Sequence, residues 1–185
     1  IIVIDNYDSF TYNLVQYLGA IDPEILVFKN DEITALEIKK LKPSSIIISP
    51  GPGRPEDSMV SIEVVNKLKN TIPILGICLG HQVIGLEFGM QITNGEHICH
   101  GKTSNIFHND DIIFQGVPSP FVATRYHSLI TDRKKYVNEL SIIAETDSGT
   151  VMGIKYNNAP MYGLQFHPES ILTEYGHTII KNFLK

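Results

Sequence analysis

Four short runs made almost wholly of aliphatic residues recur in the first eighty positions, and segments with helical spacing separate them. The runs are IIVID at 1–5, EILVF at 24–28, SIIIS at 45–49 and PILGI at 73–77. Strands that are apolar on both sides are typical of a parallel sheet whose two faces are covered by helices. We expect those helices at roughly 10–18, 34–41, 58–69 and 79–88.

The remainder of the chain has a different character. Residues 91–126 contain short strand-like pieces, His and Asn turns and no strong helical pattern, which predicts antiparallel strands at one edge of the sheet. Further strands are expected at 141–146, 151–156 and 161–166, with hairpin turns at Ser148-Gly149 and Asn157-Asn158, before a last helix at about 173–183. The pattern predicts a three-layer α/β domain spanning 1–185, with a mostly parallel open sheet flanked by helices.

Composition excludes several classes of function. The formal net charge of the 185-residue chain is -5, which argues against a nucleic-acid binder. No apolar run reaches the 18 or so residues of a membrane span, and the opening IIVID lacks the basic segment of a signal peptide. Two cysteines cannot build a disulfide framework, so we expect a reducing compartment.

The stretch GICLG at 76–80 joins the fourth strand to the next helix. It is typical of the strand–turn–helix elbow of hydrolases, with Cys78 at the position of a nucleophile. The glycines leave room for a sharp turn, and the N-terminus of the helix favours a thiolate. A lone buried cysteine is more often structural, but its place between two glycines at a strand end favours catalysis.

QFHPE at 165–169 and PGPGRP at 50–55 also follow strands. In open α/β sheets, ligands gather at the carboxyl ends of the strands. We predict that Cys78, His167 and Glu169 meet there as nucleophile, base and orienting carboxylate. The N–H groups of Gly51, in the Pro/Gly loop, and of Leu79, which follows Cys78, would converge on a developing oxyanion. Without the other motifs, His167 would be interpreted as an ordinary hydrogen-bonded residue, and the Pro/Gly loop as a rigid turn.

GICLGHQ, PGPGRP and QFHPES together resemble the class I (triad-type) glutamine amidotransferases, over the whole chain. DNYDSFTYNLVQYLG at 5–19 and RYHSLI at 125–130 resemble one branch, the glutaminase subunits (component II) of anthranilate synthase and aminodeoxychorismate synthase. The resemblance implies a flavodoxin-like fold, a γ-glutamyl thioester on Cys78, and a general base and acid at His167 oriented by Glu169. It implies an oxyanion hole at Gly51 and Leu79. The residues implied to cradle glutamine are Gly51, Pro52, Gly53, Gln82, Ser128 and Leu129.

The resemblance also implies partners. Ammonia would pass to a chorismate-binding synthase subunit, component I of anthranilate synthase or of aminodeoxychorismate synthase. The motifs leave the tryptophan route, the folate route and a shared subunit open, and we favour anthranilate. We expect no cofactor and a cytoplasmic location, or the plastid stroma for an organelle-encoded chain.

Other interpretations stay open. The same chemistry would serve guanylate or carbamoyl phosphate synthesis, a stand-alone cysteine hydrolase would share the triad, and a catalytically silent regulatory module would share the fold. We predict no metal site in EHICHG at 96–101, because His97 and Cys99 would face one side of a strand and His100 the other.

Overall fold

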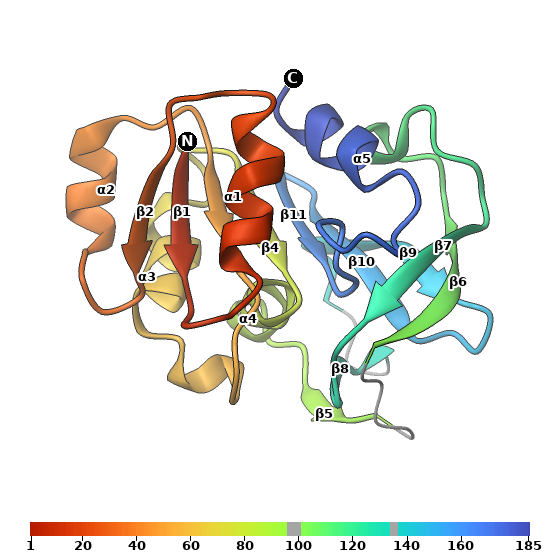
Figure 1. Ribbon diagram of the computed structural model, residues 1–185. Coiled ribbons are helices and arrows are strands. Elements are labelled where there is room, and N and C mark those ends of the chain that lie inside the picture. The colour runs from red at the N-terminus through yellow and green to blue at the C-terminus, as the bar shows by residue number, and fades with distance from the viewer. Residues whose placement is uncertain (96–100, 134–136) are drawn as a thin grey trace.

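The computed structural model describes residues 1–95, 101–133 and 137–185 (Figure 1). Within them, nine strands form one sheet in the order β2-β1-β3-β4-β11-β10-β9-β6-β7, and β5 and β8 form a separate pair. The strands are β1 (Ile2–Asp5), β2 (Leu26–Lys29), β3 (Ile46–Ile48), β4 (Ile74–Ile77), β5 (Ile92–Asn94), β6 (Lys102–His108), β7 (Phe121–Arg125), β8 (Leu129–Thr131), β9 (Leu140–Thr146), β10 (Val151–Tyr156) and β11 (Met161–Leu164). The helices are α1 (Thr11–Gly19), α2 (Ala35–Leu41), α3 (Met59–Leu68), α4 (Leu79–Glu87) and α5 (Gly176–Phe183), with 3₁₀ turns η1 (Pro55–Asp57) and η2 (Ile112–Phe114).

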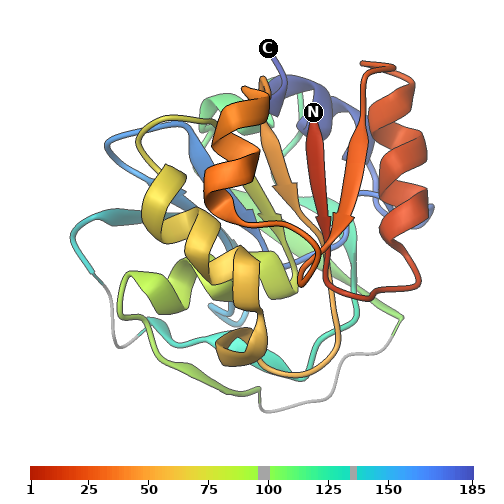
Figure 2. The same cartoon turned by 90° about the vertical axis from the view of Figure 1, so that its left-hand side faces the viewer.

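The first half of the sheet is parallel, and its strands β1, β3, β4 and β11 are buried on both faces, whereas the edge strand β2 is partly exposed. Strands β2, β1, β3, β4 and β11 pair in parallel, as the aliphatic runs predicted. Successive strand residues pack on opposite faces: Val3 and Ile47 belong to one core cluster, and Ile2 and Ile46 belong to the other. The first cluster includes residues of α1 and α5, and the second includes residues of α2, α3 and α4. The expected three-layer α/β architecture is therefore confirmed, and Figure 2 shows helices on both sides of the sheet.

The second half of the sheet is antiparallel, as predicted. Strand β11 pairs with β10, β10 with β9, β9 with β6 and β6 with β7, all antiparallel. The predicted turns at Ser148-Gly149 and Asn157-Asn158 lie between β9 and β10 and between β10 and β11. This antiparallel extension carries the residues that follow β7 toward the carboxyl end of β4 (Figure 1).

Two helix starts show where local sequence signals succeed and fail. The helix expected from Thr34 has Thr34 as its N-cap, with the capping box to Glu37 formed. The last helix begins at Gly176 rather than Thr173, because the Thr173 hydroxyl donates to the carbonyl oxygen of His167 at 2.6 Å and accepts from the Thr124 N–H at 3.0 Å. The residues before α5 therefore support the loop that carries His167.

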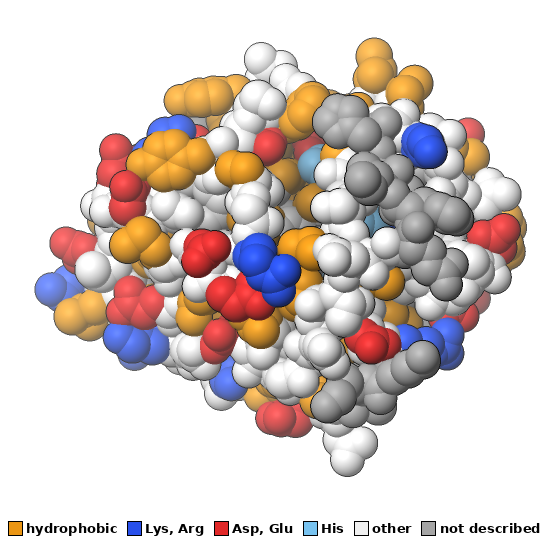
Figure 3. Space-filling view, turned by 90° about the horizontal axis from the view of Figure 1, so that it is seen from below, with side chains coloured by type: hydrophobic (Ala, Val, Ile, Leu, Met, Phe, Trp, Pro, Cys, Tyr) orange, Lys and Arg blue, Asp and Glu red, His pale blue; other side chains and the backbone are white. Residues whose placement is uncertain are grey.

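The carboxyl ends of β3, β4 and β11 lie at one edge of the sheet because these neighbours run parallel. The Pro/Gly loop follows β3, Cys78 follows β4, and His167 follows β11 by three residues. Figure 3 views this side from below, and histidine atoms are visible recessed between other side chains. Across the described ranges, no helix combines the length and the apolar character that crossing a bilayer requires.

Candidate active site

Cys78 stands at the corner between β4 and α4, with φ 51° and ψ −97°. A positive φ is strained for a residue with a side chain, and such strain is concentrated at functional sites. The corner closes only because its flanking residues are glycines. A Cβ on Gly76 would lie 2.4 Å from the carbonyl oxygen of Gly80, and a Cβ on Gly80 would lie 2.6 Å from that of Ile48. The predicted elbow is confirmed.

Backbone hydrogen bonds hold this corner in place. The N–H of Cys78 donates to the carbonyl oxygen of Leu164 at 2.8 Å, and the carbonyl oxygen of Cys78 accepts from the Gln82 N–H at 3.1 Å. Because α4 begins at Leu79, the sulfur lies beside a helix N-terminus, where unpaired N–H groups and the helix dipole favour an anion. The residue is buried, with 7% of its surface exposed.

His167 and Glu169 form a buried pair. His167 Nδ1 lies 2.7 Å from Glu169 Oε1, and each residue exposes 3% of its surface or less. Burial lowers the pKa of the imidazole, but the Cys78 sulfur and then the Glu169 carboxylate outweigh it and raise that pKa well above its ordinary value. The other ring nitrogen, Nε2, is buried without an aligned hydrogen bond in the structure. The three predicted triad residues are therefore brought together, with the imidazole between sulfur and carboxylate.

Two aromatic side chains to which the sequence analysis gave no role pack against His167. The ring centroid of Tyr126 lies 5.1 Å from that of His167, and Phe10 lies 6.3 Å away, both edge to face. The rings of Phe10 and Tyr126 are themselves 5.3 Å apart. This packing restricts the orientation of the imidazole, which is a requirement for efficient proton transfer.

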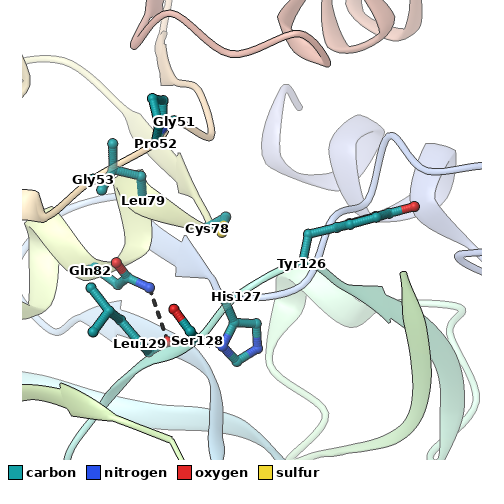
Figure 4. Close-up of a pocket in the computed structure, with 10 residues that line it drawn as sticks. All are labelled: Gly51, Pro52, Gly53, Cys78, Leu79, Gln82, Tyr126, His127, Ser128 and Leu129. Carbon is teal, nitrogen blue, oxygen red and sulfur yellow. Dashed lines mark hydrogen bonds between the residues drawn. The ribbon is translucent and has the colours of Figure 1, made fainter. Parts of the chain in front are cut away.

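A cavity of about 200 Å³ opens beside Cys78 (Figure 4). Drug-sized ligands occupy pockets of about 300–1,000 Å³, so this cavity suits a small molecule such as an amino acid. Its lining includes every residue predicted to bind glutamine or an oxyanion, together with Cys78, Tyr126 and His127. The predicted residues are Gly51, Pro52, Gly53, Leu79, Gln82, Ser128 and Leu129. His167 and Glu169 are not among the lining residues.

Polar groups in the lining of the cavity are joined by hydrogen bonds to one another and to their neighbours. Gln82 Nε2 donates to the Leu129 carbonyl oxygen at 3.2 Å and to Gln165 Oε1 at 3.1 Å (Figure 4 draws the first). The same carbonyl oxygen lies 2.9 Å from His127 Nδ1. Burial and then the Arg125 guanidinium lower the pKa of His127 to about 3. His127 is therefore neutral, with Nδ1–H donating to Leu129 and Nε2 accepting from Arg125 Nε at 3.1 Å.

Asn6 lies within the DNYDSFTYN motif and holds the loop that carries Gly51, a role that the sequence did not specify. Its Nδ2 donates to the Ser49 carbonyl oxygen at 3.0 Å, and its N–H donates to Ser49 Oγ at 2.9 Å. Its Oδ1 accepts from Asn30 and Ser61, both at 3.0 Å. A Cβ on Gly51 would lie 2.6 Å from Asn6 Cβ, so only glycine allows this close approach.

Among the residues the structure describes, no group of three or more His, Cys, Asp or Glu side chains is arranged to hold a metal. The predicted exclusion of zinc concerned His97, Cys99 and His100, which lie outside the described residues.

Comparison with known proteins gives the family. The model for class-I glutamine amidotransferases matches residues 2–185. The bifunctional protein TrpGD of Thermotoga maritima is 55% identical over the whole chain, which spans 32% of that protein. Anthranilate synthase component 2 of Pyropia yezoensis is 50% identical, over the whole chain and 98% of the relative. The aminodeoxychorismate/anthranilate synthase component 2 of Bacillus subtilis is 47% identical, over the whole chain and 95% of the relative.

A solved structure has the same fold. A protein from Thermoplasma acidophilum, described as a GMP synthase subunit, superposes with a TM-score of 0.87 at 26% identity, covering 99% of this chain and 90% of that one. With a family match over residues 2–185 and full-length relatives at about half identity, this chain belongs to the class-I glutamine amidotransferases.

Proposed function

We propose that this chain hydrolyses glutamine to glutamate and ammonia, with Cys78 as nucleophile. The thiolate attacks the carboxamide carbon of glutamine, and the His167 imidazolium gives its proton to the leaving nitrogen, so that ammonia departs and a γ-glutamyl thioester forms. His167 then takes a proton from water as the water attacks the thioester, and the thiolate leaves as glutamate is released. The observation that carries the proposal is the strained Cys78 elbow facing a buried His167–Glu169 pair beside a small cavity.

The lining of the cavity supports specific roles in binding. We assign the stabilisation of the tetrahedral oxyanion to the N–H groups of Gly51 and Leu79, because Leu79 is the first residue of α4 and its N–H has no partner within the helix. The remaining predicted residues, Pro52, Gly53, Gln82, Ser128 and Leu129, would hold the amino-acid part of glutamine. The proposed reaction requires no metal or cofactor in this chain.

The ammonia would be delivered to a synthase subunit that uses chorismate. The full-length relatives named as component 2 of anthranilate synthase support a role in tryptophan synthesis. The Bacillus subtilis relative carries both names, which supports the aminodeoxychorismate, or folate, role and a shared subunit as the second candidate. The likeness to the GMP synthase protein is weaker, at 26% identity, so guanylate synthesis is disfavoured.

An apolar surface between Glu169 and α5 supports a docking site for that partner. Ile171 is 92% exposed, Leu172 55% and Tyr175 44%. Three exposed large hydrophobic side chains in one short segment are typical of an interaction surface, and here the segment begins two residues after the triad carboxylate. Ile171→Glu should reduce stimulation of glutaminase activity by the synthase at least tenfold, whereas Ile112→Glu, at the 66% exposed Ile112, should not. Equal stimulation of the two variants would remove this surface from the proposal.

The proposal also covers the compartment, the domain organisation and the alternative of a silent module. The thiolate nucleophile suits a reducing compartment, so we place the protein in the cytoplasm, or in the plastid stroma if it is organelle-encoded. The family match over 2–185 supports a single amidotransferase domain. The alternative of a catalytically silent module is disfavoured, because Cys78, His167 and Glu169 are all present and brought together.

The test is a glutaminase assay with and without purified chorismate-using synthases. We expect glutamate release that is stimulated by the matching synthase with chorismate present and is abolished in Cys78→Ser. Stimulation by anthranilate synthase component I alone, by its aminodeoxychorismate counterpart alone or by both would separate the three pathway candidates. No glutamate release with either synthase would contradict the enzymatic proposal and favour the silent module.

A further inference from the structure

Gln165 contacts the nucleophile and is not part of the triad. It follows β11, is fully buried, and its Nε2 lies 3.6 Å from Cys78 Sγ in hydrogen-bonding geometry. Its own N–H donates to the Met152 carbonyl oxygen at 2.9 Å, which ties its backbone to the neighbouring strand β10. The side chain is thus held against the sulfur from a rigid part of the sheet.

The carbonyl oxygen of Leu129 decides which end of the Gln165 carboxamide faces the sulfur. The Leu129 carbonyl oxygen accepts hydrogen bonds and donates none, so the Gln82 side chain must present its NH₂ group to it. The same NH₂ group lies 3.1 Å from the Gln165 carboxamide, which must therefore present its oxygen to Gln82. The Gln165 NH₂ group is then left facing Cys78 Sγ. The amide orientation at the sulfur thus follows from the backbone of β8.

We propose that Gln165 is a positioning residue for the nucleophile: its carboxamide NH₂ donates a hydrogen bond to the Cys78 thiolate and, through Gln82, ties the sulfur to the glutamine-binding loop at Leu129. Hydrogen bonding to the charged form of a group favours that form. The bond therefore stabilises the charged form of the sulfur and restrains its position. That the sulfur attacks glutamine rests on the proposed function, but the effect on its ionisation does not.

The hydrogen bond between Gln82 and Gln165 also couples the cavity to the orientation of the Gln165 amide. Gln82 lines the cavity, and its side-chain NH₂ group is shared between Leu129 and Gln165. A substrate that displaced Gln82 from Leu129 would alter the hydrogen bond that orients Gln165. Substrate binding and thiolate orientation are in this way coupled through one amide group.

The experiment measures ionisation of the sulfur directly, without glutamine. The full-length protein and the variants Gln165→Met and Gln165→Glu are treated with iodoacetamide across pH 5 to 10, and modification of the Cys78 peptide is quantified by mass spectrometry. Methionine keeps the length of the side chain but removes the donor, and glutamate is isosteric but places negative charge at the sulfur. The exposed Gln16 on α1 provides the matched control, Gln16→Glu.

We expect the pH of half-maximal alkylation to rise by about one to two units in Gln165→Met and by more in Gln165→Glu, because the thiolate loses a charge-assisted hydrogen bond in both variants and meets negative charge in the second. Gln16→Glu should match the parent. Glutaminase kcat should fall about tenfold or more in both Gln165 variants. If Gln165→Met does not fold, judged by thermal melting, Gln165→Glu alone decides.

Two results are distinguishable. Alkylation profiles of the folded variants that superpose on the parent would overturn the role of Gln165, even if the parent is an active glutaminase. Shifted profiles in the Gln165 variants, together with a parent protein that releases no glutamate, would leave the role of Gln165 standing and overturn the proposed reaction instead.

Discussion

Replacing Glu169 with Gln tests how much the buried carboxylate contributes to the base. In the native protein the carboxylate accepts from His167 Nδ1–H at 2.7 Å, and both side chains are almost fully buried. A hydrogen bond to a charged group contributes about 1.5–3 kcal/mol, against about 0.5–1.5 for a neutral one. The amide also removes a charge that raises the pKa of His167, so the imidazolium needed to protonate the leaving nitrogen is less favoured.

We therefore expect a loss of about 2–3 kcal/mol in transition-state stabilisation. At 1.36 kcal/mol per decade, this corresponds to a fall in kcat of about 30- to 160-fold. Steady-state glutaminase assays at pH 7.5 measure it, with Glu174→Gln as control, because Glu174 binds the Val122 N–H at the surface and should change kcat less than threefold. A folded Glu169→Gln protein with kcat within threefold of the parent would refute the assignment of Glu169 as orienting residue.

Three further predictions concern the scaffold of the site. Gly80→Ala should lower the free energy of unfolding by about 3 kcal/mol in urea titrations, because its Cβ would meet the Ile48 carbonyl oxygen, and an unchanged urea midpoint would contradict this. Asn6→Ala should lower kcat about tenfold or more with a smaller change in KM, because Ser49 before the Gly51 loop loses the hydrogen bond from Asn6 Nδ2, and Asn30 and Ser61 lose their acceptor. Kinetics equal to the parent would argue against that role. His127 has its pKa lowered to about 3, so the unfolded chain takes up its proton first as pH falls below about 6.5. Folding should therefore lose about 3 kcal/mol from this residue between pH 6.5 and 4, and His127→Gln should show a shallower loss in urea titrations across that range.

The parallel half of the fold was predictable because its signal is local. The runs at 1–5, 45–49 and 73–77 are aliphatic on both faces, and only burial between two helix layers suits such strands. The meeting of Cys78 with His167 was predictable because parallel neighbours bring their carboxyl ends to one edge. The pairing of β9 with β6 was not, since these two strands are distant in sequence and no motif marks their contact.

The supporting residues of the site escaped prediction for a related reason. Asn6, Phe10 and Tyr126 act through contacts that only the folded chain creates, such as the ring packing on His167 and the hydrogen bonds to the loop after β3. Gln165 lies inside the QFHPE motif, but the direction of its amide depends on a carbonyl group of β8. The start of the last helix was misplaced because Thr173 supports the His167 loop instead of beginning α5.

The central claim, a covalent intermediate on the sulfur at the strained elbow, is tested most directly by rapid acid quenching of the protein during turnover of glutamine. Peptide mass spectrometry of the quenched protein should find a γ-glutamyl thioester on Cys78, and Cys78→Ala should release no glutamate. Undiminished glutamate release from Cys78→Ala, or turnover in the parent with no adduct at Cys78 at any quench time, would contradict the account.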